Sequence, residues 1–199
     1  MMQEQEHAKI RRALQAKYAE ISRSAIGKFT YLTGYEGVQA LQYDTSGLSR
    51  LSNEHLKSFC GVGNPFLAGP IDKGESLLDV GCGSGIDLVV ASHYVGDAGR
   101  ICGIDITSEM LSAATRNLQA AGMNDFELKE GSAESIPYED STFDIVISNG
   151  VLNLSTRKEL AFSEILRVLV PDGRLQFPDI VLEDESVKDT SFTLESWLD

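Results

Sequence analysis

A short glycine-rich stretch carries the clearest chemical signal in this sequence. The stretch is Asp79-Val80-Gly81-Cys82-Gly83-Ser84-Gly85, and it lies between two apolar runs. Because glycine has no Cβ atom, Gly81 and Gly83 would let the backbone approach a ligand, and Gly85 would let the next helix pack against a sheet. Open α/β sheets bind ligands at such strand-to-helix loops. The stretch therefore predicts a ligand-binding loop, and a tight turn without a ligand is the alternative.

Three further features narrow the choice of ligand. A dinucleotide fingerprint needs Gly or Ala where this sequence has Ile86, and the Gly-Lys-Ser/Thr ending of a P-loop is absent. Asp105 follows Gly85 by twenty residues, and a carboxylate there could accept hydrogen bonds from both ribose hydroxyls of an adenosine. The small polar turn Gly131-Ser132-Ala133-Glu134 could meet an adenine edge. These features disfavour a nicotinamide or flavin dinucleotide and favour another adenosine-containing ligand.

The elements that would position these residues alternate between strand and helix from residue 75 onward. Such alternation indicates βαβ units and a parallel sheet. We therefore predict an α/β fold, a Rossmann-like, doubly wound and mostly parallel sheet. The expected strands are 76–80, 100–105, 125–130, 143–148 and one that begins at Arg174. At Pro178 this last strand bulges or pairs on one side only, and Pro171-Asp172-Gly173 forms a turn before it. The expected helices are 86–95, one between a Thr107 cap and Gly122, and one from a Thr156–Glu159 capping box to about Val170.

The chain divides into three predicted parts. Residues 1–74 form an N-terminal helical lid and substrate region, in which 5–25 is an amphipathic helix with Ile10, Leu14, Tyr18 and Ile21 on one face. Residues 75–182 form the ligand-binding domain, and 183–199 form an acidic C-terminal segment.

Composition restricts the class of partner. The 17 basic and 30 acidic residues give a formal net charge of −13, which disfavours nucleic acid and anionic membranes. We find no run of 18 apolar residues and no signal peptide, and the three cysteines suit reduced thiols, so we expect a cytoplasmic protein. No CxxC pair is present to hold a structural zinc. The absence of a basic groove favours a small-molecule substrate.

The motifs, taken in order, resemble those of the class I S-adenosylmethionine-dependent methyltransferases over roughly residues 60–182. The resemblance rests on residues 79–85, Asp105, Gly131-Ser132-Ala133-Glu134 and Ser148-Asn149-Gly150-Val151. It implies that S-adenosylmethionine is the cosubstrate. The resemblance implies that Gly81, Gly83 and Gly85 lie along the methionine part and the ribose, and that Asp105 binds the ribose hydroxyls. It implies that Ile106 and Met110 pack near the adenine, that Ser132 and Ala133 meet the adenine edge, and that Asn149 lies beside the sulfonium. The other implied cofactor-binding residues are Asp79, Cys82, Glu134 and Gly150.

A narrower similarity links the chain to the arsenite methyltransferase branch. It rests on residues 148–155, residues 167–175 and Cys60-Gly61-Val62-Gly63-Asn64-Pro65. That branch holds trivalent arsenic with several thiols, and this chain has Gly150 at one such position and ends at Asp199 before another. Cys60 is left as the candidate catalytic thiol, whereas Cys82 and Cys102 are expected to pack in the interior.

The expected function is methyl transfer to a small molecule, such as a thiol or a metalloid like arsenite. The alternative is a module that binds S-adenosylmethionine or a partner without turnover, because residues 182–199 are too few for the two antiparallel strands that the family adds, and we expect these strands to be missing. A partner subunit could supply a strand, so a homodimer is possible. A dinucleotide-dependent oxidoreductase is a third reading, weakened by Ile86.

Overall fold

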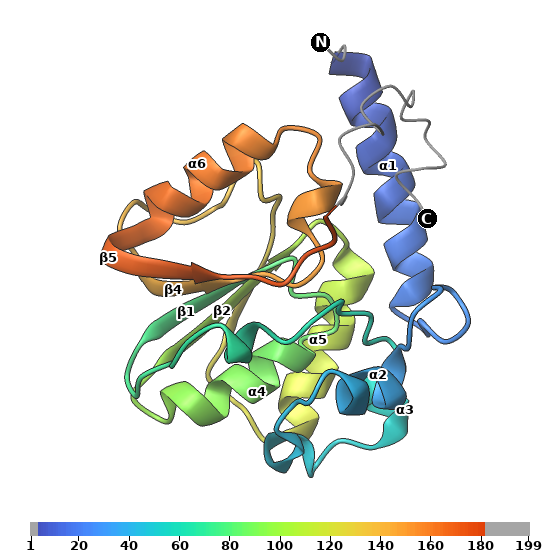
Figure 1. The fold of residues 1–199 in the computed structure, drawn as a ribbon, viewed down its shortest axis with the longest axis vertical. Helices are drawn as coiled ribbons and strands as arrows, with labels where there is room; N and C mark the ends of the chain where they lie inside the picture. The colour runs from blue at the N-terminus through green and yellow to red at the C-terminus, as the bar shows by residue number, and fades with distance from the viewer. Residues whose placement is uncertain (1–3, 182–199) are drawn as a thin grey trace.

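The computed structural model describes residues 4–181, and its centre is a five-stranded sheet in which every pairing is parallel (Figure 1). The strand order is β3-β2-β1-β4-β5. The predicted α/β fold with a Rossmann-like parallel sheet is therefore confirmed. The strands are β1 (Ser76–Val80), β2 (Arg100–Asp105), β3 (Glu127–Glu130), β4 (Phe143–Ile147) and β5 (Leu169–Gln176).

Helices cover both faces of the sheet because its central strands are apolar on both sides. On one face, Leu77 and Ile145 pack with α4 (Ile86–Val95) and α5 (Ser108–Ala120). On the other face, Leu78 and Val146 pack with α6 (Lys158–Val168). Figure 1 shows α4 and α5 on the side of the sheet opposite α6. These layers match the predicted crossover helices.

The N-terminal region packs against helix α4 and forms part of the hydrophobic core. Helix α4 is buried along most of its length because short elements and the segments between them lie over it and add Val38, Tyr43, Leu48, Leu56 and Phe59 to its apolar cluster. These elements are α2 (Gly34–Ala40), η1 (Thr45–Leu48), α3 (Asn53–Leu56) and η2 (Pro65–Leu67).

Helix α1 (Glu4–Ile21) is the amphipathic helix that the spacing predicts. Ile10, Leu14 and Ile21 are buried, and Tyr18 is half-buried. In Figure 1 the helix stands beside the ends of the strands, apart from the layers that cover the sheet. Among residues 4–181, no helix is both long and apolar enough to cross a bilayer.

Two predicted boundaries are wrong for a physical reason. The residues Pro171-Asp172-Gly173 do not form a turn before the last strand but bulge within β5, because Phe143 pairs with Leu169 and Ile145 pairs with Arg174. Asp172 has a φ of +65°, which a regular strand cannot accommodate. The strand ends at Gln176, before Pro178.

The predicted Thr156–Glu159 capping box does not form either. Helix α6 begins at Lys158 with Arg157 at its N-cap and no side-chain cap. The Thr156 hydroxyl instead donates a hydrogen bond to Glu134, a residue distant in sequence, and so does not cap the helix. Thr107 likewise does not cap α5 with its side chain. The expectations for 183–199 and for missing C-terminal strands fall outside the described residues.

Candidate active site

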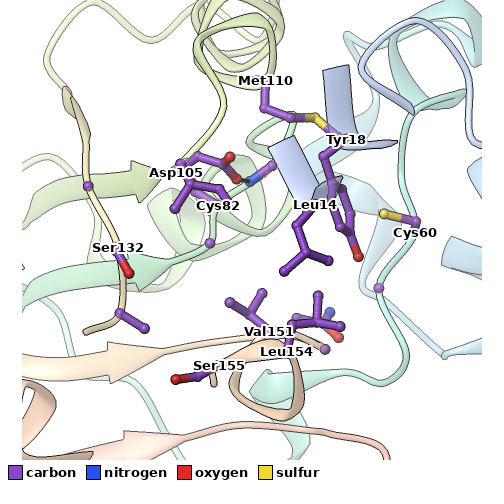
Figure 2. Close-up of a pocket in the computed structure, with 18 of the residues that line it drawn as sticks. Leu14, Tyr18, Cys60, Cys82, Asp105, Met110, Ser132, Val151, Leu154 and Ser155 are labelled. Atoms are coloured by element: carbon purple, nitrogen blue, oxygen red, sulfur yellow. Dashed lines mark hydrogen bonds between the residues drawn. The ribbon is translucent and has the colours of Figure 1, made fainter. Parts of the chain in front are cut away.

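A cavity lies at the carboxyl ends of β1, β2 and β4, where the chain order reverses across the sheet, and α1 closes it from above. Ligands bind at such switch points in open α/β sheets. Figure 2 shows Leu14 and Tyr18 of α1 facing Val151 and Leu154 from the segment after β4. All the predicted site residues line this cavity except Asp79 and Gly85.

The three glycines of the loop after β1 have different roles, although all have positive φ. A Cβ at Gly83 would meet nothing within 4 Å, so its backbone lies bare against the cavity. A Cβ at Gly81 would collide with the side chain of Val151. Gly85 does not line the cavity, and a Cβ there would come within 3.0 Å of Ala114 on α5. Gly85 is thus required for packing between helices, not against the sheet as predicted.

Asp105 holds this loop from the end of β2. Its Oδ2 accepts a hydrogen bond from Gly83 N at 3.0 Å, and its Oδ1 accepts one from Thr107 N at 2.9 Å. Burial raises the pKa of Asp105 to about 6, although the hydrogen bonds from Thr107 and Gly83 lower it. Each carboxylate oxygen has about two lone-pair directions, so each can accept one more donor. The residue therefore fits a pair of ribose hydroxyls.

Asp79 lies near two other carboxylates, those of Asp87 and Asp105. Asp79 is buried, its Oδ2 has no hydrogen-bond partner among the described residues, and its pKa is raised by burial and by the charges of Asp87 and Asp105. Burial also raises the pKa of Asp87 to about 6, against hydrogen bonds from Tyr43 and Asn149. When they are ionised, these groups create a negative potential that suits a cationic ligand such as a sulfonium.

Asn149 lines the cavity, but its polar atoms are occupied. Its Oδ1 accepts hydrogen bonds from Val62 N at 2.9 Å and Gly63 N at 3.2 Å, and its Nδ2 donates to Asp87 Oδ2 at 3.0 Å. The Tyr43 hydroxyl donates to Asp87 Oδ1 at 2.6 Å. This network fixes the loop after Cys60 onto the strand ends.

Asp87 and Tyr43 belong to this network although neither is predicted from the sequence. An acidic residue inside the apolar run Ile86-Asp87-Leu88-Val89 is the signal that could have indicated Asp87. Tyr43 lies in a turn-rich stretch with no such signal.

Glu134 also lines the cavity, yet it holds protein groups rather than an open edge. Its Oε1 accepts hydrogen bonds from Ser155 Oγ at 2.9 Å, Thr156 N at 3.1 Å and Arg157 N at 3.2 Å, and its Oε2 pairs with Arg11 of α1 at 3.1 Å. Burial alone would raise its pKa, but these hydrogen bonds and the Arg11 charge lower it overall. Glu134 thus connects α1 to the segment before α6.

The remaining wall around the expected adenine position is largely apolar. Met110 is buried against Ile21, and Ala133 and Ile106 border the same space, with Ser132 beside them. Gln15 of α1 donates a hydrogen bond to the Ile106 carbonyl at 2.9 Å, which anchors the covering helix over this wall.

The three cysteines are free thiols and lie in different parts of the site region. Cys60 lies on the cavity wall opposite Asp105, close to Tyr18 (Figure 2), and burial raises the pKa of its thiol to about 12, with the Asp105 charge acting in the same direction. Cys82 borders the cavity from below and is buried, and Cys102 is buried within β2. Among the described residues, no group of three His, Cys, Asp or Glu side chains could hold a metal ion.

Comparison with known proteins agrees with this geometry. The family model described as a methyltransferase domain matches residues 71–197, which is more than half of the chain. Together with the sheet and the glycine loop, this match shows that the chain belongs to the class I S-adenosylmethionine-dependent methyltransferases.

Relatives within the family have different printed functions. The chain is 34% identical to an arsenite methyltransferase of Halobacterium salinarum over 75% of this chain and 38% of that protein. It is 36% identical to a demethylmenaquinone methyltransferase of Oceanobacillus iheyensis over 53% of this chain and 44% of that protein. The chain therefore spans less than half the length of these curated relatives.

A solved methyltransferase structure is similar to this chain in fold. An arsenic(III) S-adenosylmethionine methyltransferase from Chlamydomonas reinhardtii superimposes with a TM-score of 0.60 at 34% identity, covering 76% of this chain and 52% of that one.

Proposed function

We propose that this chain transfers the methyl group of S-adenosylmethionine to a small, neutral acceptor with a soft nucleophilic atom, a thiol or a trivalent metalloid such as arsenite. The observation that supports it best is the arrangement of one cavity. The bare backbone of Gly83 and the carboxylate of Asp105 form one wall, and Cys60 stands in the opposite wall.

The cofactor side of the cavity fits an adenosyl group. The free lone pairs of Asp105 would accept hydrogen bonds from the ribose hydroxyls, and Ile106, Met110 and Ala133 offer an apolar surface for the adenine. S-adenosylmethionine supplies an activated methyl group bonded to a positively charged sulfur. The carboxylates of Asp87 and Asp105 favour that charge electrostatically.

The acceptor side restricts the nucleophile. Leu14, Val151 and Leu154 line it with apolar side chains (Figure 2), which would shield a bound acceptor from water. Burial raises the pKa of the Tyr18 hydroxyl well above its usual range, so this group stays neutral and cannot act as a strong base at neutral pH. An acceptor that needs no strong base suits the site, because its own lone pair forms the bond to the methyl carbon as the carbon–sulfur bond breaks.

Cys60 is the group through which arsenite would be recognised. Its sulfur is protonated at neutral pH, so a new bond from this sulfur to the arsenic of arsenite would replace one As–O bond, and the thiol proton and the departing hydroxyl would leave together as water. The similarity to two proteins named as arsenic methyltransferases supports this acceptor, and the similarity to a protein named as a demethylmenaquinone methyltransferase keeps a neutral organic acceptor as the competing choice.

A second candidate is binding of S-adenosylmethionine without turnover. It is favoured by the occupied state of Asn149, whose amide is fully engaged with Val62, Gly63 and Asp87 and so is not free to orient an acceptor.

Incubation with methyl-labelled S-adenosylmethionine and a panel of dithiothreitol, arsenite and phenol separates these functions. We expect transfer to at least one acceptor, and loss of arsenite methylation alone in Cys60→Ser would identify arsenite as the acceptor that needs this thiol. Tight cofactor binding without transfer to any acceptor would favour the binding module.

A further inference from the structure

A second hollow, which we call the basic groove, lies between the end of α1, the end of α3 and one face of α5. Its α5 residues include Ser112, Ala113, Arg116 and Asn117, whose spacing places them on one side of the helix. Arg23 and Lys57 complete the opposite walls. These three cations are far apart in sequence, so only the fold brings them together.

Two of these cations have no partner. Arg23 and Arg116 are exposed, and neither side chain forms a hydrogen bond or an ion pair among residues 4–181. Lys57 pairs with Glu54, and Glu109, the second acid of the groove, accepts a hydrogen bond from Ser108 at 3.2 Å. In a chain of net charge −13, two unpaired guanidinium groups beside one hollow therefore form a local donor surface.

The groove also contains a largely buried serine. Ser58 is 5% exposed, and its hydroxyl has no hydrogen bond within the described part of the chain. The hydroxyl oxygen is not among the polar atoms that are sealed from solvent without a partner, so it stays open to a hollow and is free to donate a hydrogen bond there. Nearby, Asn117 donates hydrogen bonds from Nδ2 to the carbonyls of His55 at 3.2 Å and Ser84 at 2.9 Å, which fixes the floor of the groove.

We propose that the basic groove binds an oxyanion, a phosphate or carboxylate group. The guanidinium groups of Arg23 and Arg116 can each bind two oxygens of such a group, the Lys57 ammonium adds a point charge, and the Ser58 hydroxyl offers a further donor. Three cations in one hollow of a strongly acidic chain do not suit nucleic acid, which requires an extended basic surface.

Ser58 borders both the basic groove and the main cavity. The oxyanion is therefore either a free ion or the anionic group of a larger molecule. Both sources would use the same donors. A comparison of inorganic phosphate with a phosphate ester tells the free ion from the anionic group of a larger molecule.

Calorimetric titration of the full chain with inorganic phosphate at low ionic strength tests the proposal. We expect one saturable site, and a loss of affinity of about tenfold for each of Arg23→Ala and Arg116→Ala, since a charge-assisted hydrogen bond contributes about that factor. Ser58→Ala should weaken binding as well. Lys73→Ala is the matched control, because Lys73 is an exposed cation outside the groove and its side chain has no partner in the described part of the chain.

Tighter binding of phenyl phosphate than of inorganic phosphate would assign the site to a larger phosphorylated molecule, and equal binding would assign it to the free ion. No saturable binding, or equal binding by wild type and the Arg23→Ala/Arg116→Ala double variant, would overturn the proposal. The titration uses neither cofactor nor acceptor, so its result is independent of methyl transfer.

Discussion

The carboxylate of Asp105, at the end of β2, accepts a hydrogen bond from the backbone N–H of Gly83, in the loop after β1, at 3.0 Å. This bond joins the two segments that the cofactor would contact. The same carboxylate also receives Thr107 N at 2.9 Å, so its orientation is fixed by the backbone on both sides. Preorganisation of this kind lowers the cost of binding because little must be ordered when the ligand arrives.

The contrast between Gly83 and Gly81 can be tested by adding one methyl group at each. Alanine at positive φ costs about 1 kcal/mol at either position, but at Gly81 the new Cβ also collides with Val151. We expect Gly83→Ala to weaken cofactor binding with a small loss of stability. We expect Gly81→Ala to lower the free energy of unfolding by about 3 kcal/mol, and Val151→Ala to restore part of it.

Gly96 provides the control for Gly83. It has a φ of +65° and open space around its Cβ position, but it lies outside the cavity. Gly96→Ala should therefore cost the same stability in urea denaturation and leave cofactor affinity unchanged. Equal losses of affinity in Gly83→Ala and Gly96→Ala would show that backbone strain, not contact with the ligand, is responsible.

The hydrogen bond from Tyr43 to Asp87 should make the stability of a variant depend on pH. Burial raises the folded-state pKa of Asp87 to about 6, above its unfolded value, so this group's contribution to stability is present at low pH and is lost as pH rises through about 6. Tyr43→Phe removes a bond that lowers this pKa, and the loss then becomes larger. We expect a penalty of about 1 kcal/mol at about pH 5 and a greater one at about pH 8.

Urea denaturation at both pH values measures this effect, and Tyr35→Phe is the matched control because Tyr35 is exposed. A penalty for Tyr43→Phe that does not change with pH would mean that Asp87 does not titrate in this range.

Glu134 and Arg11 form one ion pair but should contribute unequally. The Arg11 side chain is 51% exposed and that of Glu134 is 9% exposed. Arg11→Ala should cost less than about 1 kcal/mol, as exposed pairs do. Glu134→Ala also leaves the N–H groups of Thr156 and Arg157 without their acceptor, so we expect about 3 kcal/mol.

Because Glu134 links α1 to the segment before α6, its loss should also speed release of S-adenosylhomocysteine in stopped-flow measurements. Glu134→Gln keeps the size of the side chain and an acceptor oxygen and should be intermediate. If Arg11→Ala and Glu134→Ala have the same effect, the ion pair alone would account for the role of Glu134.

The sequence predicts the strand and helix order well because that information is local. The strand–glycine loop–helix unit at 76–95 and the acid at Asp105 depend on residues close together in the chain, and the structure places each where expected. The boundaries of β5 and α6 depend on distant partners. Pairing with β4 on both sides of Pro171 and Asp172 includes these residues in β5, and the hydroxyl of Thr156 donates its hydrogen bond to Glu134.

The same distinction explains what the sequence does not reveal about the site. Asp87 meets Tyr43, 44 residues before it, and Asn149, 62 residues after it. These three residues are far apart in sequence and share no motif. The sequence predicts Asn149 and Glu134 as site residues, but only the fold reveals the partners of their hydrogen bonds.

Calorimetric titration with S-adenosylhomocysteine most directly tests whether Asp105 and the bare loop at Gly83 form a cofactor site. Wild type should bind at one site, and Asp105→Ala should bind at least about tenfold more weakly, because it removes acceptors of charge-assisted hydrogen bonds. Asp97→Ala removes an exposed acid outside the cavity and should bind as wild type does. Absence of binding by wild type, or equal binding by wild type and Asp105→Ala, would contradict the account.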